Sequence, residues 1–122
     1  LFCVLTYKMS CDLEKTVTEI KRGSTFEQVI TCLDESDIAV NLSGWGVSSD
    51  LKESPGASGL LSFTVDSGSF ASGIVGISAT PAETLVLPAD YSLQYDIKFV
   101  EPSGAVYYTE TMYLKTSRHI TD

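Results

Sequence analysis

The sequence predicts an all-β fold in which about seven to eight short antiparallel strands form a β-sandwich. Apolar residues do not recur with the period of about 3.6 residues that marks an amphipathic helix. Runs of strand length are instead separated by turn signals about every ten residues. The last two runs alternate between apolar and polar residues, which is typical of strands with one buried face.

The expected strands follow one another along most of the chain. They cover residues 12–20, 25–33, 38–42, 45–51, 60–66, 72–79, 91–100 and 105–116. One short helical turn is expected at 80–84, where Thr80 can cap the helix and Pro81 can occupy its first position.

The last hairpin allows a prediction of register. A two- or four-residue loop would pair Phe99 with Val106 and Leu93 with Met112, and would place all the large apolar residues of both strands on one face. A three-residue loop would instead turn Thr109 inward. The first register is preferred because it buries more apolar surface. The predicted core of this hairpin is Leu93, Ile97, Phe99, Val106, Tyr108, Met112 and Leu114.

The preferred register leaves Tyr107 and Tyr113 on the outward face. Exposed tyrosines can reflect β-propensity alone, but tyrosine is also enriched in protein interfaces. A second candidate contact surface is the apolar run near the N-terminus, formed by Phe2, Val4, Leu5 and Tyr7. The alternative is that residues 1–8 form a leader that takes no part in the fold.

The chain is expected to hold one domain, because no repeat or linker divides its 122 residues. Residues 1–11 are interpreted as an N-terminal arm or leader, 12–116 as the β-sandwich and 117–122 as a C-terminal tail.

Charge and cysteine usage limit the partners. Sixteen acidic and eight basic residues give a net charge of −8, which disfavours binding to nucleic acid. No run is long and apolar enough for a membrane helix, so no membrane partner is expected. Three cysteines without C-x-x-C spacing predict neither a zinc site nor a structural disulfide, and Cys32 is expected to be a buried free thiol in a reducing compartment.

Catalytic motifs are scarce in the sequence. Its one histidine, His119, lies near the C-terminus, and no G-x-S-x-G or H-E-x-x-H motif occurs. Oxygen ligands cluster enough to suggest calcium at Asp34, Glu35, Asp37 and Asn41, but these residues lack the spacing of a calcium loop. No glycine-rich phosphate loop is present, so neither a cofactor nor a small-molecule substrate is expected. Trp45 could stack on a sugar, although a single Trp at the start of a strand is more often a core residue.

Several short segments form a set that is more specific than any one of them. They are KRGSTF (21–26), VNLSGW (40–45), GIVGIS (73–78), LPADY (87–91), YDI (95–97) and SGAV (103–106). Taken together they resemble the small Ig-like domains of tailed-bacteriophage virion proteins, including the N-terminal domain of baseplate upper proteins. The order of these segments spans about residues 17–116. The resemblance implies an Ig-like β-sandwich that serves as an oligomeric building block without catalytic residues.

The function expected from this resemblance is that of a non-catalytic structural component of a virion, in the tail, baseplate, neck or capsid surface. Such a protein is made in the host cytoplasm, and its partners are other virion proteins and copies of itself. The alternative is a cell-surface or periplasmic Ig-like module that recognises a glycan or a protein.

Overall fold

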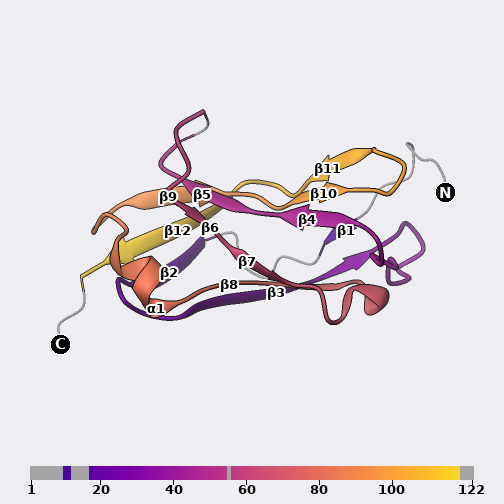
Figure 1. Ribbon diagram of the computed structural model, residues 1–122, viewed down its shortest axis with the longest axis horizontal. Helices are drawn as coiled ribbons and strands as arrows, with labels where there is room; N and C mark the ends of the chain where they lie inside the picture. Colours follow the sequence, from indigo (N-terminus) through magenta and orange to yellow (C-terminus); the bar gives the residue numbers. More distant parts are fainter. Residues whose placement is uncertain (1–9, 12–16, 55, 119–122) are drawn as a thin grey trace.

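The computed structural model describes residues 10–11, 17–54 and 56–118. The strands form two layers packed face to face, and the molecule is an Ig-like β-sandwich (Figure 1). The predicted fold class is therefore confirmed. No helix in the described ranges has the length and apolar character needed to span a membrane.

The first layer is an antiparallel sheet of four strands in the order β1-β3-β8-β7. Its strands are β1 (Ser10–Cys11), β3 (Phe26–Leu33), β8 (Ile74–Ala79) and β7 (Thr64–Asp66). Residues 38–42 were expected to form a strand, but their backbone makes only an isolated bridge, between Leu33 and Ala39.

The second layer has two parts, in the orders β2-β12-β9-β5-β6 and β11-β10-β4. Its strands are β2 (Val17–Lys21), β4 (Gly46–Ser48), β5 (Asp50–Lys52), β6 (Leu61–Ser62), β9 (Ser92–Tyr95), β10 (Lys98–Val100), β11 (Val106–Tyr108) and β12 (Met112–Ser117). β4 and β5, β9 and β10, and β11 and β12 follow one another along the chain. The three-stranded part therefore continues the five-stranded part, beyond a point at which these three runs of chain all leave the regular strand pairing. β2 joins the layer by parallel pairing with β12.

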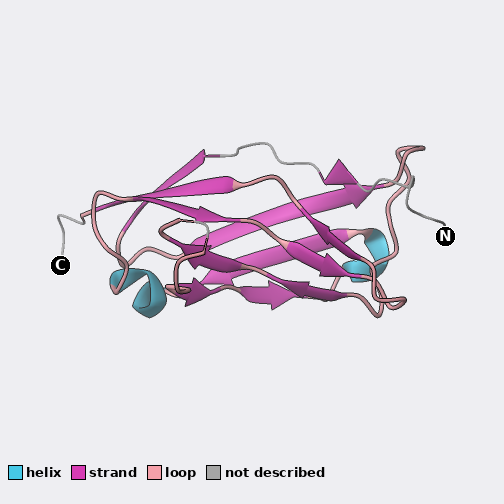
Figure 2. Ribbon diagram, turned by 90° about the horizontal axis from the view of Figure 1, so that it is seen from above, coloured by secondary structure: helices cyan, strands magenta, loops and turns pink. Residues whose placement is uncertain are grey.

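Two short helices lie at opposite ends of the sandwich (Figure 2). They are η1 (Phe70–Ser72) and α1 (Pro81–Leu85). The helix predicted at 80–84 is confirmed as α1. Thr80 Oγ1 accepts a hydrogen bond from the Glu83 N–H, and the Glu83 carboxylate accepts one from the Thr80 N–H. This reciprocal capping box satisfies two backbone donors at the start of the helix.

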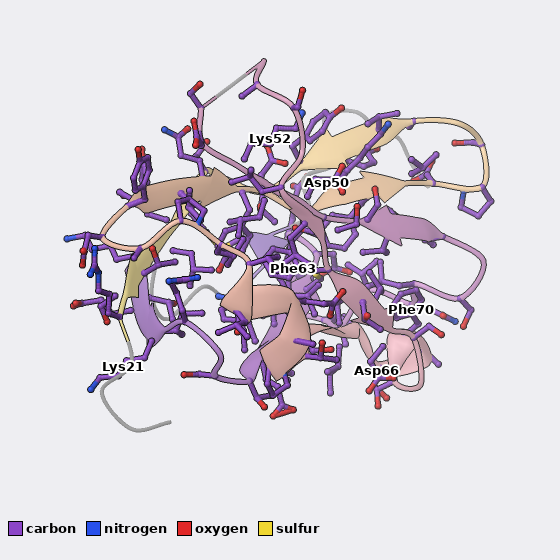
Figure 3. The ribbon with its side chains drawn as sticks, turned by 60° about the vertical axis from the view of Figure 1, so that its left-hand side comes forward. Lys21, Asp50, Lys52, Phe63, Asp66 and Phe70 are labelled. Carbon is purple, nitrogen blue, oxygen red and sulfur yellow. The ribbon has the colours of Figure 1, made fainter. Side chains whose placement is uncertain are left out.

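The core fills the space between the layers. Its centre is an aromatic cluster in which the ring centroids of Phe26 and Phe63 are 5.1 Å apart and those of Phe63 and Tyr95 are 5.2 Å apart. Figure 3 shows Phe63 in this interior position. The Tyr95 hydroxyl donates a 2.8 Å hydrogen bond to Oε1 of Gln28, so the polar end of the buried ring is satisfied.

The last hairpin differs from the predicted register. Phe99 lies opposite Tyr107, and Leu93 lies opposite Leu114. The connection is the three-residue loop 102–104, closed by a hydrogen bond from the Glu101 N–H to the Ala105 carbonyl. Five of the seven predicted core residues are buried, but Val106 and Tyr108 are 46% and 61% exposed.

The reason for this difference is a β-bulge in the last strand. Tyr95 pairs with Met112 and Lys98 pairs with Tyr108, so two residues on one strand face three on the other, at 109–111. An extra residue reverses the alternation of faces beyond it. Met112 and Leu114 therefore point into the core as predicted, whereas Tyr107 replaces Tyr108 on the inner side.

The expectation of a free thiol at Cys32 is wrong. Cys32 is fully buried and disulfide-bonded. Its backbone lies opposite Cys11 of β1, which pairs with the end of β3. A cross-link from this central strand limits the freedom of the unfolded chain, which stabilises the folded state.

The corrected faces predict which truncations destabilise the fold. Replacing Ile97 or Leu114 by Ala should cost about 2–5 kcal/mol, because both side chains are fully buried and would leave a cavity. Val106→Ala is the matched control and should cost less than about 0.5 kcal/mol. Urea unfolding followed by circular dichroism measures all three. Equal losses at Leu114 and Val106 would contradict the bulge.

The disulfide predicts sensitivity to reductant. Reduction should lower the melting temperature, with a loss on the order of 2–4 kcal/mol in the free energy of unfolding. A Cys32→Ala variant should melt at the same temperature with and without reductant. A parent protein whose melting temperature does not respond to reduction would show that the bond does not stabilise the fold.

Candidate functional site

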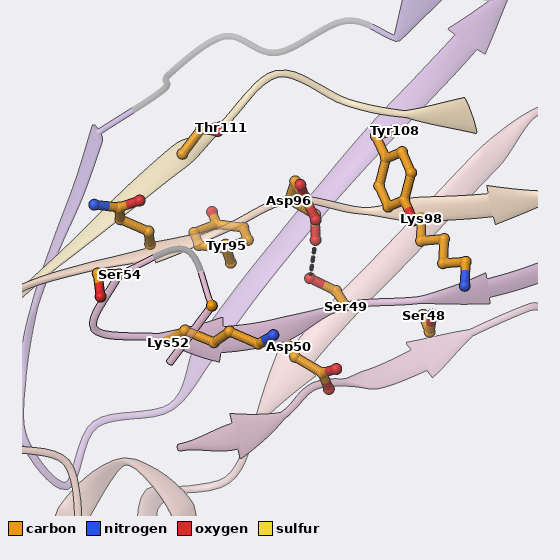
Figure 4. Close-up of a pocket in the computed structure, with 12 residues that line it drawn as sticks. Ser48, Ser49, Asp50, Lys52, Ser54, Tyr95, Asp96, Lys98, Tyr108 and Thr111 are labelled. Carbon is orange, nitrogen blue, oxygen red and sulfur yellow. Dashed lines mark hydrogen bonds between the residues drawn. The ribbon is translucent and has the colours of Figure 1, made fainter. Parts of the chain in front are cut away.

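A cavity of about 350 Å³ lies on the outer face of the second layer, where its central strands are interrupted (Figure 4). The β4–β5 segment contributes Ser48, Ser49, Asp50 and Lys52 to its lining, and the following loop contributes Ser54 and Gly56. The β9–β10 segment contributes Gln94, Tyr95, Asp96 and Lys98, and the last strand contributes Tyr108 and Thr111.

Side-chain hydroxyls replace ladder hydrogen bonds at the interruption. Ser49 is 4% exposed, and its hydroxyl donates a 2.6 Å hydrogen bond to the Asp96 carbonyl. On the other side of that strand, the Ile97 N–H donates a 2.9 Å hydrogen bond to Oγ1 of Thr109. The Asp96 carbonyl and the Ile97 N–H, which both lie at the interruption, are thus paired by side chains, and this holds the interruption in a defined shape.

The loop after β5 borders the cavity on one side. It rises from the second layer in Figure 1, and Ser54 and Gly56 line the cavity from it. Gly56 has a φ of +82°, a left-handed conformation that side chains disfavour. A glycine at this position lets the loop turn back over the sheet.

Two acidic and two basic side chains surround the cavity. Asp50 receives a 2.7 Å hydrogen bond from the Ser62 hydroxyl. Within the described residues, the only ion pair is between Arg118 and Asp90, so Lys52, Lys98 and Asp96 have no charged partner there within 4 Å. These groups keep their hydrogen-bonding capacity for water or a ligand.

Tyr108 is the exposed aromatic group of the cavity. It pairs with Lys98 across the two strands, and the two side chains lie beside each other at the rim (Figure 4). Because 61% of this residue is exposed, the ring offers an apolar surface next to polar groups.

The structure separates the two tyrosines that the sequence placed together. Tyr113 faces outward and is 37% exposed, as predicted. Tyr107 is partly buried, packs against the core and lies 6.0 Å from the ring of Trp45, so its outward placement is wrong. Desolvation raises the pKa of Tyr107, and the negative charge of the Glu101 carboxylate raises it further. Phe2, Val4, Leu5 and Tyr7 lie outside the described residues.

The acidic turn considered for calcium has a structural use. One oxygen of Asp34 accepts hydrogen bonds from the N–H groups of Ser36 and Ile38, at 2.8 and 3.1 Å. This arrangement is an Asx turn, which stabilises the reversal of the chain. The described part of the chain contains no group of three or more His, Cys, Asp or Glu residues that could hold a metal ion.

Sequence reasoning missed the cavity itself. Gln94, Asp96 and Lys98 are the polar members of the alternating strand that was used to identify the core. A run of three long or charged outward residues is a weak signal. Their meeting with Asp50 and Lys52 depends on strand pairing that the sequence does not reveal.

Comparisons with known proteins give a fold and no family. No family model and no curated protein matches the sequence. The chain is similar to the structure of a mutant SrpA adhesin from Streptococcus sanguinis, with 17% identity and a TM-score of 0.58 over 94% of this chain. The chain spans 60% of that adhesin chain. It is also similar to the Lin-41 filamin domain, with 14% identity and a TM-score of 0.49 over 96% of this chain and 97% of that one.

Tyr95, which lines the cavity and belongs to the core, predicts a pH effect. Burial raises its pKa to about 12. The folded state therefore holds the proton more tightly than the unfolded state, whose tyrosine ionises near about pH 10. The resulting stabilisation is complete below about pH 10 and is lost as the pH rises to about 12.

Tyr95→Phe tests this effect. The variant should lose about 1 kcal/mol near neutral pH, because the Gln28 carbonyl loses its donor. The difference between parent and variant should shrink between about pH 10 and 12, measured by urea unfolding at each pH. A difference that stays constant across this range would contradict the burial of a neutral phenol.

Proposed function

We propose that this chain is a non-catalytic recognition and assembly domain that contacts its partner through the outer face of the second layer. The observation that carries the proposal is the cavity at the strand interruption, with Tyr108 at its rim and its charged groups unpaired within the described residues. Tyr113 adds a second exposed ring on the same layer. We call this surface, from Tyr113 across the cavity to Lys52, the outer face.

The outer face has the physical character of a binding surface. Tyrosine buries a large area on contact and loses little conformational entropy, while its hydroxyl keeps a hydrogen-bond partner. Strands hold their side chains more firmly than loops do. Strands contribute most of the cavity's lining and the loop after β5 borders one side, so the groups on the strands are ordered before a partner arrives.

The surroundings of the two carboxylates in the cavity fit binding and do not fit catalysis. A carboxylic acid that donates a proton near neutral pH is usually kept in an apolar pocket with little water. Asp50 is exposed, and Asp96 is only half-buried beside other polar groups. The site therefore offers hydrogen bonds and charge but not the environment of a general acid.

For the larger assembly, we propose a structural role in a bacteriophage particle, in its tail, baseplate, neck or capsid surface. The support is the order of the segments over residues 17–116 that resemble Ig-like virion domains. Partners would be other virion proteins and copies of this chain. Phe2, Val4, Leu5 and Tyr7 stay candidate contact residues in this proposal, together with Tyr113.

A second candidate is a cell-surface or periplasmic recognition module, and the disulfide at Cys32 favours it. Disulfides form and persist in oxidising compartments and are rare in the cytosol. A virion domain assembled in the host cytoplasm would acquire the bond only after release. Mass spectrometry of purified particles and of cell-envelope fractions distinguishes the two locations. Absence from particles would exclude the virion role.

The outer face can be tested by substitution. A Tyr108→Ser, Tyr113→Ser double variant should keep the circular dichroism of the parent, because both residues are exposed. It should lower the retention of the domain on its particle or envelope fraction at least about tenfold, as expected when interface tyrosines are lost. Val29→Ser is the matched control, because Val29 is 68% exposed on the first layer. Equal retention of all three proteins would disprove the proposed face.

A further inference from the structure

We infer that the cavity of the outer face binds a neutral carbohydrate unit, with Tyr108 as the stacking platform. This inference rests on the proposed function and adds the chemical class of the ligand. It follows from the size of the cavity, the balance of its charges and the position of its exposed ring.

The size of the cavity favours a compact ligand. Its volume of about 350 Å³ lies at the small end of the range of ligand pockets. Ser54 and Gly56 border it on the loop side. A peptide that adds a strand needs a free sheet edge, whereas the part of the cavity lined by Asp50, Lys52 and Gln94 lies over β5 and β9, which have neighbours on both sides.

The lining provides both donors and acceptors. Sugar hydroxyls donate and accept hydrogen bonds at the same time, so a site for them needs both kinds of group. Asp96 offers carboxylate acceptors, Lys98 offers donors and the Gln94 amide offers both. None of these three side chains has a hydrogen-bond partner or an ion-pair partner among the described residues.

The balance of charge favours a neutral ligand. Asp50 and Asp96 stand against Lys52 and Lys98, so the cavity is close to neutral although the chain carries a net charge of −8. A strongly anionic ligand would meet the two carboxylates, and a cationic ligand would meet the two ammonium groups.

Tyr108 supplies the apolar part of the site. The C–H faces of a sugar ring are apolar and pack on an aromatic ring, while the hydroxyls around the edge reach polar groups. Tyr108 has such a ring at the rim, beside Lys98 and within reach of the polar lining (Figure 4). Tyr113 lies on the same layer but does not line the cavity.

The test is an NMR titration of the intact chain with galactose, glucose, mannose and N-acetylglucosamine, each as the free sugar. At least one sugar should shift amide signals at 48–52, 94–98 and 108–111, with a millimolar Kd. Tyr108→Ala should weaken this binding at least tenfold, and Asp96→Asn should weaken it less. Tyr91→Ala is the matched control and should bind like the parent, because Tyr91 is 51% exposed and does not line the cavity.

Each outcome decides the inference. It is overturned if none of the four sugars shifts these signals, if the shifts fall elsewhere, or if Tyr108→Ala binds like the parent. If the sugars fail while the Tyr108→Ser, Tyr113→Ser variant still loses retention on its particle or envelope, the face recognises a protein and the proposed function stands. If retention is also unchanged, the proposed function fails as well.

Discussion

Both faces of the second layer depend on one extra residue in the last strand, at 109–111. Without it, alternation would continue unchanged from β11 to β12, and either the Tyr107 side or the Met112 side would face solvent. The bulge lets both segments bury their larger apolar groups. Thr109 lowers the energetic cost of the bulge. Its hydroxyl accepts a hydrogen bond from the Ile97 N–H, which would otherwise lack a partner in the ladder.

The sequence predicts those features of the fold that depend on a few neighbouring residues, and it fails for features that depend on several distant ones. The alternation of Leu93, Ile97 and Phe99 and the capping of α1 by Thr80 are contained in a few residues, and both predictions are confirmed. The hairpin register was wrong because a loop length and a bulge act together, and the alternation of apolar residues can be satisfied by more than one combination of the two. The disulfide of Cys32 was missed because an odd number of cysteines gives no pairing rule.

The candidate site was less predictable than the fold because it joins residues that are distant in sequence. The hydrogen bond between Ser49 and Asp96 spans 47 residues, and each partner by itself is an ordinary polar residue of a strand. Tyr108 was assigned to the core, so its value as an exposed ring could not be recognised. Tyr113 was placed correctly because its half of the strand lies beyond the bulge, where the predicted and observed faces agree.

The same strands carry the core and the proposed recognition surface, yet different residues form each. Tyr95 packs with Phe26 and Phe63 below the cavity, and its hydroxyl is fixed by Gln28 of the opposite layer. The floor of the site is therefore tied to the centre of the core, where interiors are densely packed and resist deformation. Tyr108 stands on the other side of this floor with most of its surface exposed. A change at Tyr108 can thus alter the proposed recognition surface with little effect on folding, whereas a change at Tyr95 must alter folding first.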